Sequence, residues 1–160
     1  MILPIFELRR FNGVESYDVE TAKCNSYQRE GATEAVFVVT TSRCNASLSD
    51  TEELYATPNI EIGFKICEPL SSIFTAGAKY SNLPEYDEDL EEWMTNLYYC
   101  EHQGVDNVTV EIESADSGTV TATIEGTTTD INYYDGSKPD TTVFVRAVFQ
   151  RQMNLEKSFG

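Results

Sequence analysis

The sequence predicts an α+β fold: a mostly antiparallel, curved β-sheet of about six to eight strands with one main amphipathic helix. Several windows alternate apolar and polar residues with period two, as strands with one buried face do. Residues 87–99 instead place their apolar side chains on one helical stripe. These observations leave open whether the sheet forms a sandwich or an open barrel.

The first half of the chain contains four predicted strands. Residues 5–11 and 14–21 flank Asn12-Gly13, a dipeptide that favours a type I′ turn, so they are expected to form a hairpin. Residues 35–39 are apolar on both faces, which is typical of a strand in the middle of a sheet. Residues 60–66 alternate cleanly and predict a half-buried strand.

The second half adds the helix and three more strands. Residues 108–112 and 120–124 alternate on either side of a polar turn, which predicts a second hairpin. Residues 141–149 are apolar on both faces and are expected to lie mid-sheet. The helix at 87–99 should cover a face of the sheet, and a weaker helix is expected at 50–55.

Length and charge restrict the class of protein. The 160 residues suit a single domain spanning 1–160. Eleven basic and 27 acidic residues give a net charge of −16, which disfavours binding to nucleic acid or anionic membranes. No targeting segment or apolar run of membrane-spanning length is present, and the four cysteines are widely spaced, so we expect a cytoplasmic protein with reduced thiols.

The sequence contains no recognisable catalytic or metal-binding constellation. His102 is the only histidine, and no GxSxG, HExxH, Walker or GxGxxG motif occurs. A zinc site would have only Cys100 and His102 close together, and residues 130–136 have the wrong spacing for an EF-hand loop. We therefore expect no enzyme activity, cofactor or metal.

The leading functional hypothesis is a non-catalytic, acidic protein-binding module, similar in role to an immunity or inhibitor protein, with a basic protein as partner. Acidic residues on the predicted helix and a loop with adjacent tyrosines are the candidate contact groups. The candidate partner-binding residues are Glu88, Glu91, Glu92, Asp130, Tyr133, Tyr134 and Asp135.

The alternative is a pocket protein that holds a small ligand under the helix, or an enzyme that uses Asp and Tyr there. The candidate lining residues are Trp93, Tyr98, Phe144 and Phe149. A deep apolar cavity would favour this alternative, whereas a filled core with an exposed polar surface would favour the binding module.

Overall fold

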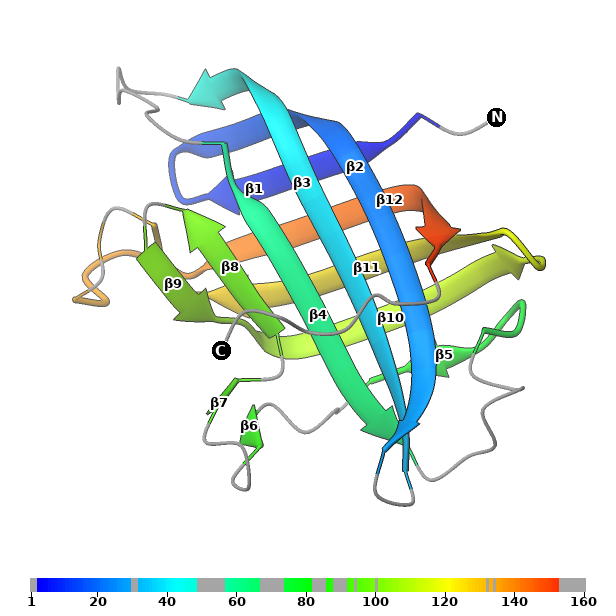
Figure 1. Cartoon of the computed structure of the whole chain (residues 1–160). Coiled ribbons are helices and arrows are strands. Elements are labelled where there is room, and N and C mark those ends of the chain that lie inside the picture. The colour runs from blue at the N-terminus through cyan, green and yellow to red at the C-terminus, as the bar shows by residue number, and fades with distance from the viewer. Residues whose placement is uncertain are drawn as a thin grey trace.

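The computed structural model describes residues 3–29, 32–48, 57–66, 74–81, 86–87, 92–93, 95–99, 101–131, 133 and 135–152. These residues form strands, turns and irregular segments (Figure 1), and no helix occurs among them. The prediction of an α+β fold with a main helix is therefore wrong, because the described architecture is all-β.

Ten strands form one sheet, and the short strands β6 and β7 pair separately. The order across the large sheet is β5-β10-β11-β12-β1-β2-β3-β4-β8-β9. The strands are β1 (Ile5–Arg10), β2 (Gly13–Arg29), β3 (Ala32–Leu48), β4 (Asn59–Ile66), β5 (Lys79–Tyr80), β6 (Tyr86–Asp87), β7 (Glu92–Trp93), β8 (Thr95–Tyr99), β9 (Glu101–Gly104), β10 (Asp106–Ala115), β11 (Thr119–Thr128) and β12 (Thr141–Arg151). The ten strands of this sheet exceed the predicted six to eight.

The predicted helix at 87–99 is replaced by strands wherever it is described. β8 pairs with β4, where Leu97 lies opposite Ile60, and Leu97 and Tyr99 enter the core. Without β8, the backbone N–H and C=O groups along one edge of β4 would have no strand partner. This long-range pairing outweighs a local helical pattern. Residues 88–91 and 94, and the weaker helix predicted at 50–55, lie outside the described residues.

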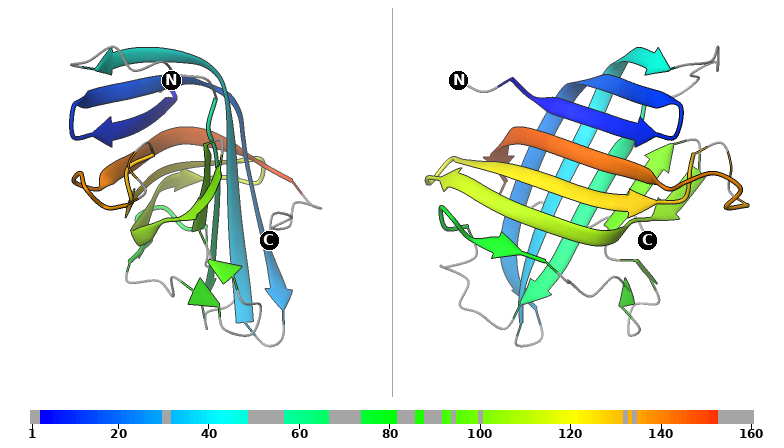
Figure 2. Two further views of the ribbon diagram at one scale, coloured as in Figure 1. Left: turned by 90° about the vertical axis from the view of Figure 1, so that its left-hand side faces the viewer. Right: turned by 180° about the vertical axis from the view of Figure 1, so that it is seen from behind.

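The sheet curls into a half-barrel (Figure 2), so that one part of it crosses and faces another. In Figure 1, β2, β3 and β4 cross β1, β12, β11 and β10 steeply. β2 serves both parts: its first residues pair with β1, and register shifts between Asp18 and Thr21 mark a bulge in its pairing with β3. Since a β-bulge bends a strand and increases its twist, this position allows the sheet to turn.

Aromatic side chains pack against one another on the inside of the curl. The ring of Phe37 in β3 lies 5.0 Å from that of Phe149 in β12, between centroids, and 5.6 Å from that of Phe74. Phe64 of β4 lies 6.3 Å from Phe37 and 4.9 Å from Tyr80. The two facing parts of the sheet therefore share one core, which aromatic contacts stabilise beyond the area they bury.

The predicted strands and hairpins are confirmed. Residues 60–66 lie in β4, and the second hairpin is β10 and β11. Residues 35–39 and 141–149 lie mid-sheet in β3 and β12. The first hairpin is β1 and β2, but Arg10 pairs with Gly13, so the turn residues are Phe11 and Asn12 rather than Asn12 and Gly13.

That register places the Arg10 side chain inside the molecule, where it forms a buried ionic network. Its guanidinium donates two hydrogen bonds of 2.9 Å to Asp130 and one of 3.0 Å to Glu15. The Tyr17 hydroxyl donates to Glu15, and the Thr141 hydroxyl donates to Asp130 over 2.9 Å. The side chains of Arg10, Glu15 and Asp130 have no solvent exposure. Residues 120 positions apart are thereby joined in the interior.

Replacing Asp130 with Asn should lower the free energy of unfolding by about 3–5 kcal/mol, because it leaves a buried guanidinium with incomplete compensation. Glu113→Gln is the matched control, since Glu113 pairs with Arg146 on the surface and should cost at most about 1 kcal/mol. Urea denaturation of both variants measures the difference. Equal losses would show that the buried network has no special weight.

Candidate functional site

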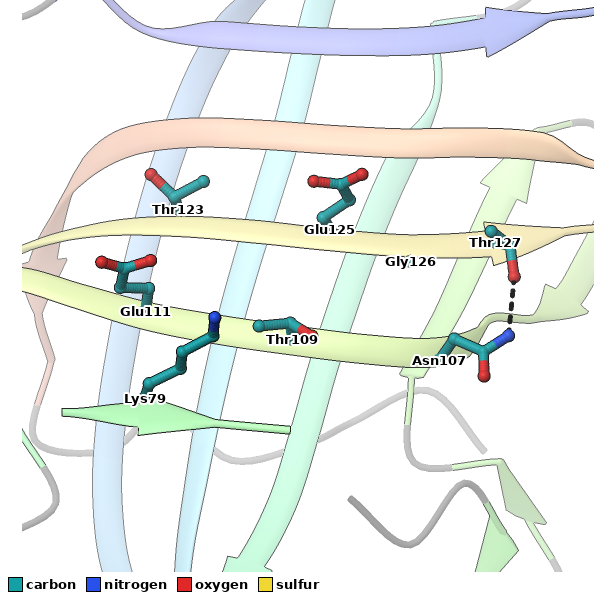
Figure 3. A pocket seen from close by; sticks show the side chains of 8 residues that line it. All are labelled: Lys79, Asn107, Thr109, Glu111, Thr123, Glu125, Gly126 and Thr127. Atoms are coloured by element: carbon teal, nitrogen blue, oxygen red, sulfur yellow. Dashed lines mark hydrogen bonds between the residues drawn. The ribbon is translucent and has the colours of Figure 1, made fainter. Parts of the chain in front are cut away.

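The candidate site is a polar groove on the outer face of β10 and β11 (Figure 3). Because side chains alternate along a strand, Val108, Val110 and Ile112 point into the core and their neighbours point outward. The groove has a volume of about 450 Å³. It is lined by Lys79, Asn107, Thr109, Glu111, Thr123, Glu125, Gly126 and Thr127.

A β-bulge shapes one end of this groove. The register between β10 and β11 shifts between Asp106 and Thr109, and Asn107 adopts a left-handed conformation with φ of 53°. Its amide donates a hydrogen bond of 3.2 Å to the Thr127 hydroxyl. A side chain at Gly126 would place its Cβ 2.6 Å from Val105 Cγ1, so only glycine lets the bulge approach β11 this closely.

The charged groups of the groove are Glu111, Glu125 and Lys79. Glu111, Glu125 and Lys79 make no ion pair or hydrogen bond within the described part of the chain. Figure 3 shows Lys79 extending from β5 over β10, between Glu111 and Thr109. The groove therefore presents two carboxylates and one ammonium to its surroundings, together with several hydroxyls.

Other acidic groups on the same face are already engaged. Arg146 donates two hydrogen bonds of 2.9 Å to Glu113, which holds the pKa of that carboxyl below its usual range. Asp116 accepts hydrogen bonds from the backbone N–H groups of Gly118 and Thr119 in its turn, which lower its pKa. Glu7 pairs with Arg9 at 3.0 Å. The carboxylates of Glu111 and Glu125 differ from these three because they have no ion-pair or hydrogen-bond partner among the described residues.

The carboxylates and hydroxyls of the groove can bind a cationic group. Carboxylates and hydroxyls accept hydrogen bonds from ammonium and guanidinium groups, which form the stronger, charge-assisted kind. Within the described residues, no group of three or more His, Cys, Asp or Glu side chains could hold a metal ion.

The predicted partner-binding residues do not gather at one place that the structure describes. Glu88 and Glu91 lie outside the described residues, as does Tyr134, and Glu92 lies in β7 with its side chain undescribed. Asp130 is buried and belongs to the ionic network. Asp135 is exposed, and hydrogen bonds from the Ser137 side chain and from the Ser137 backbone N–H, the latter 3.0 Å long, lower its pKa.

Tyr133 lies beside the first hairpin instead of standing alone. Its ring centroid is 5.5 Å from that of Phe11 in an edge-to-face contact. The Lys138 ammonium lies 5.1 Å from the Phe11 centroid and 5.4 Å from that of Tyr133. These contacts fasten the loop between β11 and β12 to the turn between β1 and β2.

The predicted pocket residues do not share a cavity in the described part of the structure. Phe149 is packed in the core, whereas Phe144 points to the outer face, where the Arg9 guanidinium lies 4.3 Å from its ring centroid. Tyr98 lies on the face of β8 opposite to Leu97 and is half-buried. Trp93 lies in β7, and its side chain is not described.

Sequence reasoning missed both the groove and the ionic network, although signals for each existed. Glu111 and Glu125 lie at the polar positions of the alternating pattern in strands that the sequence predicts. The pattern therefore predicts that their side chains point outward. Arg10 occupies the apolar phase of β1, after Phe6 and Leu8. A charged residue at a core-facing position needs a buried partner, and this indicates a network before its members are known.

Comparisons with protein family models, with curated proteins and with solved structures give no match for this chain. Within the described residues, no helix is long and apolar enough to cross a membrane.

Gly126→Ala tests whether the bulge needs glycine. The added Cβ would lie 2.6 Å from Val105 and 3.1 Å from the Asp106 carbonyl oxygen, so we expect a loss of about 1–3 kcal/mol in the free energy of unfolding. Gly118→Ala is the control, because its nearest neighbour is Asp116 Oδ1 at 3.7 Å. Thermal unfolding compares the two. A loss in Gly118→Ala as large as that in Gly126→Ala would contradict the steric account.

Cys24 provides a test of pH dependence. Its side chain is fully buried in the core, and burial raises the pKa of its thiol from 9.0 to about 12. Because the folded state holds this proton more tightly than the unfolded state, the contribution of Cys24 to stability is complete below pH 9.0 and declines as pH rises toward about 12. Cys24→Ala should show a smaller decline over this window. Rapid alkylation of native Cys24, mapped by mass spectrometry, would contradict its burial.

Proposed function

We propose that this protein is a non-catalytic binding module that holds a basic segment of a partner protein against the outer face of β10 and β11. The observation that supports the proposal is the pair of uncommitted carboxylates, Glu111 and Glu125, in a groove whose neighbouring acids are engaged. Lysine and arginine side chains of a partner would supply the cations that these carboxylates lack among the described residues.

The net charge of −16 supports the same type of partner. A strongly acidic protein attracts basic molecules over a distance set by ionic strength, which speeds their encounter. The outward threonines beside the carboxylates can accept further hydrogen bonds from a partner. Thr109 and Thr123 are two of them.

The packing of the described residues inside the curl favours this function over a small-ligand pocket. Rings from β3, β4 and β12 occupy the inside of the curl, and the groove lies outside it. A drug-sized ligand is normally enclosed in a mostly apolar cavity, whereas the groove is open and most of its lining residues are polar or charged.

An oligolysine peptide is the probe that tests the proposal before a partner is known. The double variant Glu111→Gln/Glu125→Gln should bind it about 2-fold to 30-fold more weakly, because exposed ion pairs contribute about 0.2–1 kcal/mol each. Lys79→Gln should bind it more tightly, since it removes the repulsive ammonium from the groove. Calorimetric titration at low and moderate salt measures both changes, and binding should weaken as salt increases.

Asp140→Asn is the matched control, because Asp140 is an exposed carboxylate in the loop before β12, outside this groove. It changes the net charge by the same amount per substitution without altering the proposed site. If Asp140→Asn weakens binding as much as Glu111→Gln does, the peptide responds to net charge alone and the assignment of the groove is wrong.

A further inference from the structure

The large sheet contains an opening between β2 and β12. β1 lies between these strands, and its first pair with β12 is Ile5 with Arg146. Beyond that point β12 pairs directly with β2, through Gln150 with Lys23. Between the two contacts, residues 19–22 of β2 and 147–149 of β12 have no strand partner on their facing edges among the described residues.

A cavity of about 330 Å³ occupies this opening. Its lining is partly apolar and includes Val19, Ala22, Ala147 and Val148. Val148 is 37% exposed, one of few large apolar side chains in the described residues to be so open to solvent. Unpaired strand edges beside apolar surface form a template for contact with another chain.

The chain just before β1 supplies an apolar group at the edge of this cavity. Pro4 lines the opening, and its lack of an N–H prevents it from extending the ladder as a donor. Leu3 is 80% exposed. An apolar side chain held in solvent next to an apolar opening is complementary to a copy of that opening in another molecule.

The charges around the opening are self-complementary. Glu20 and Lys23 line it, are both exposed, and have no ion pair within the described residues. A two-fold symmetric contact brings the same patch of both copies together, so Glu20 of one copy can face Lys23 of the other. On a protein with a net charge of −16, these two groups add no net charge to the patch, which lessens self-repulsion there.

We propose that this opening is the contact surface of a symmetric homodimer, in which Leu3 of each copy occupies the opening of the other. Val19 and Val148 line the site that receives it. The contact lies apart from the groove on β10 and β11, since the two cavities share no lining residue. It does not depend on the proposed binding of a basic partner.

Sedimentation equilibrium of the wild-type chain over a wide concentration range should show a monomer–dimer equilibrium. The dissociation constant should fall as salt is added, because screening reduces repulsion between the two acidic copies. Leu3→Asp should raise it by at least about tenfold, since the dimer loses two buried leucines. Ser81→Asp is the control, as it adds the same charge at an exposed position after β5, at the far edge of the sheet.

A charge exchange identifies the contact itself. Glu20→Lys and Lys23→Glu should each weaken the dimer by placing like charges together, and the double variant should restore it. Each variant alters an exposed side chain, so the monomer should fold as before. A monomer at every concentration overturns the proposal. So does a dimer that Leu3→Asp and Ser81→Asp weaken equally, or one that the double exchange does not restore.

Discussion

The bidentate contact between Arg10 and Asp130 joins two parts of the chain that are far apart in sequence. Arg10 ends β1, and Asp130 follows β11, so the interaction fixes the first hairpin against the loop that leads into β12. Glu15 and Thr141 complete the hydrogen bonding of the buried charges. Because an uncompensated buried charge is costly, the register of β1 with β2 and the start of β12 must be compatible with this geometry. The ionic network and the aromatic core lie in the same curled sheet and constrain it differently. Close packing stabilises the rings in many orientations, whereas the buried ion pairs need a specific hydrogen-bond geometry.

The candidate groove depends on that curl indirectly. β11 pairs with β12, which in turn pairs with β1. The outer face of β11 is therefore oriented by the same sheet that contains the ionic network. The bulge at Asn107 and the missing side chain at Gly126 then adjust the local shape. Among the described residues, Arg146 pairs with Glu113 and not with Glu111 or Glu125. Asp116 accepts its hydrogen bonds within its own turn. A binding surface made of such residues has little effect on the core, which allows its chemistry to change without loss of the fold.

Both proposed surfaces arise where regular pairing is interrupted. At the groove, a bulge lets β10 approach β11 closely. At the opening, β1 starts only at Ile5, after Pro4, so it does not extend to the place where β12 meets β2, and strand edges are left between them. A fully regular closed barrel would have neither feature, since every edge would be paired. The half-barrel therefore keeps polar and apolar sites on different parts of one sheet.

The sequence by itself determined the strands with clear alternation, the two hairpins, the central positions of β3 and β12, and the acidic character of the molecule. These follow from local periodicity and composition, which are properties of the chain alone. Tertiary structure decided that residues 95–99 form a strand beside β4, although their pattern also suits a helix. Backbone hydrogen bonds to β4 and burial of apolar side chains in the core stabilise that strand. It also decided that Arg10, Glu15 and Asp130 meet, and that the groove and the opening exist. Each of these depends on contacts between distant residues, whose free energy no local pattern contains.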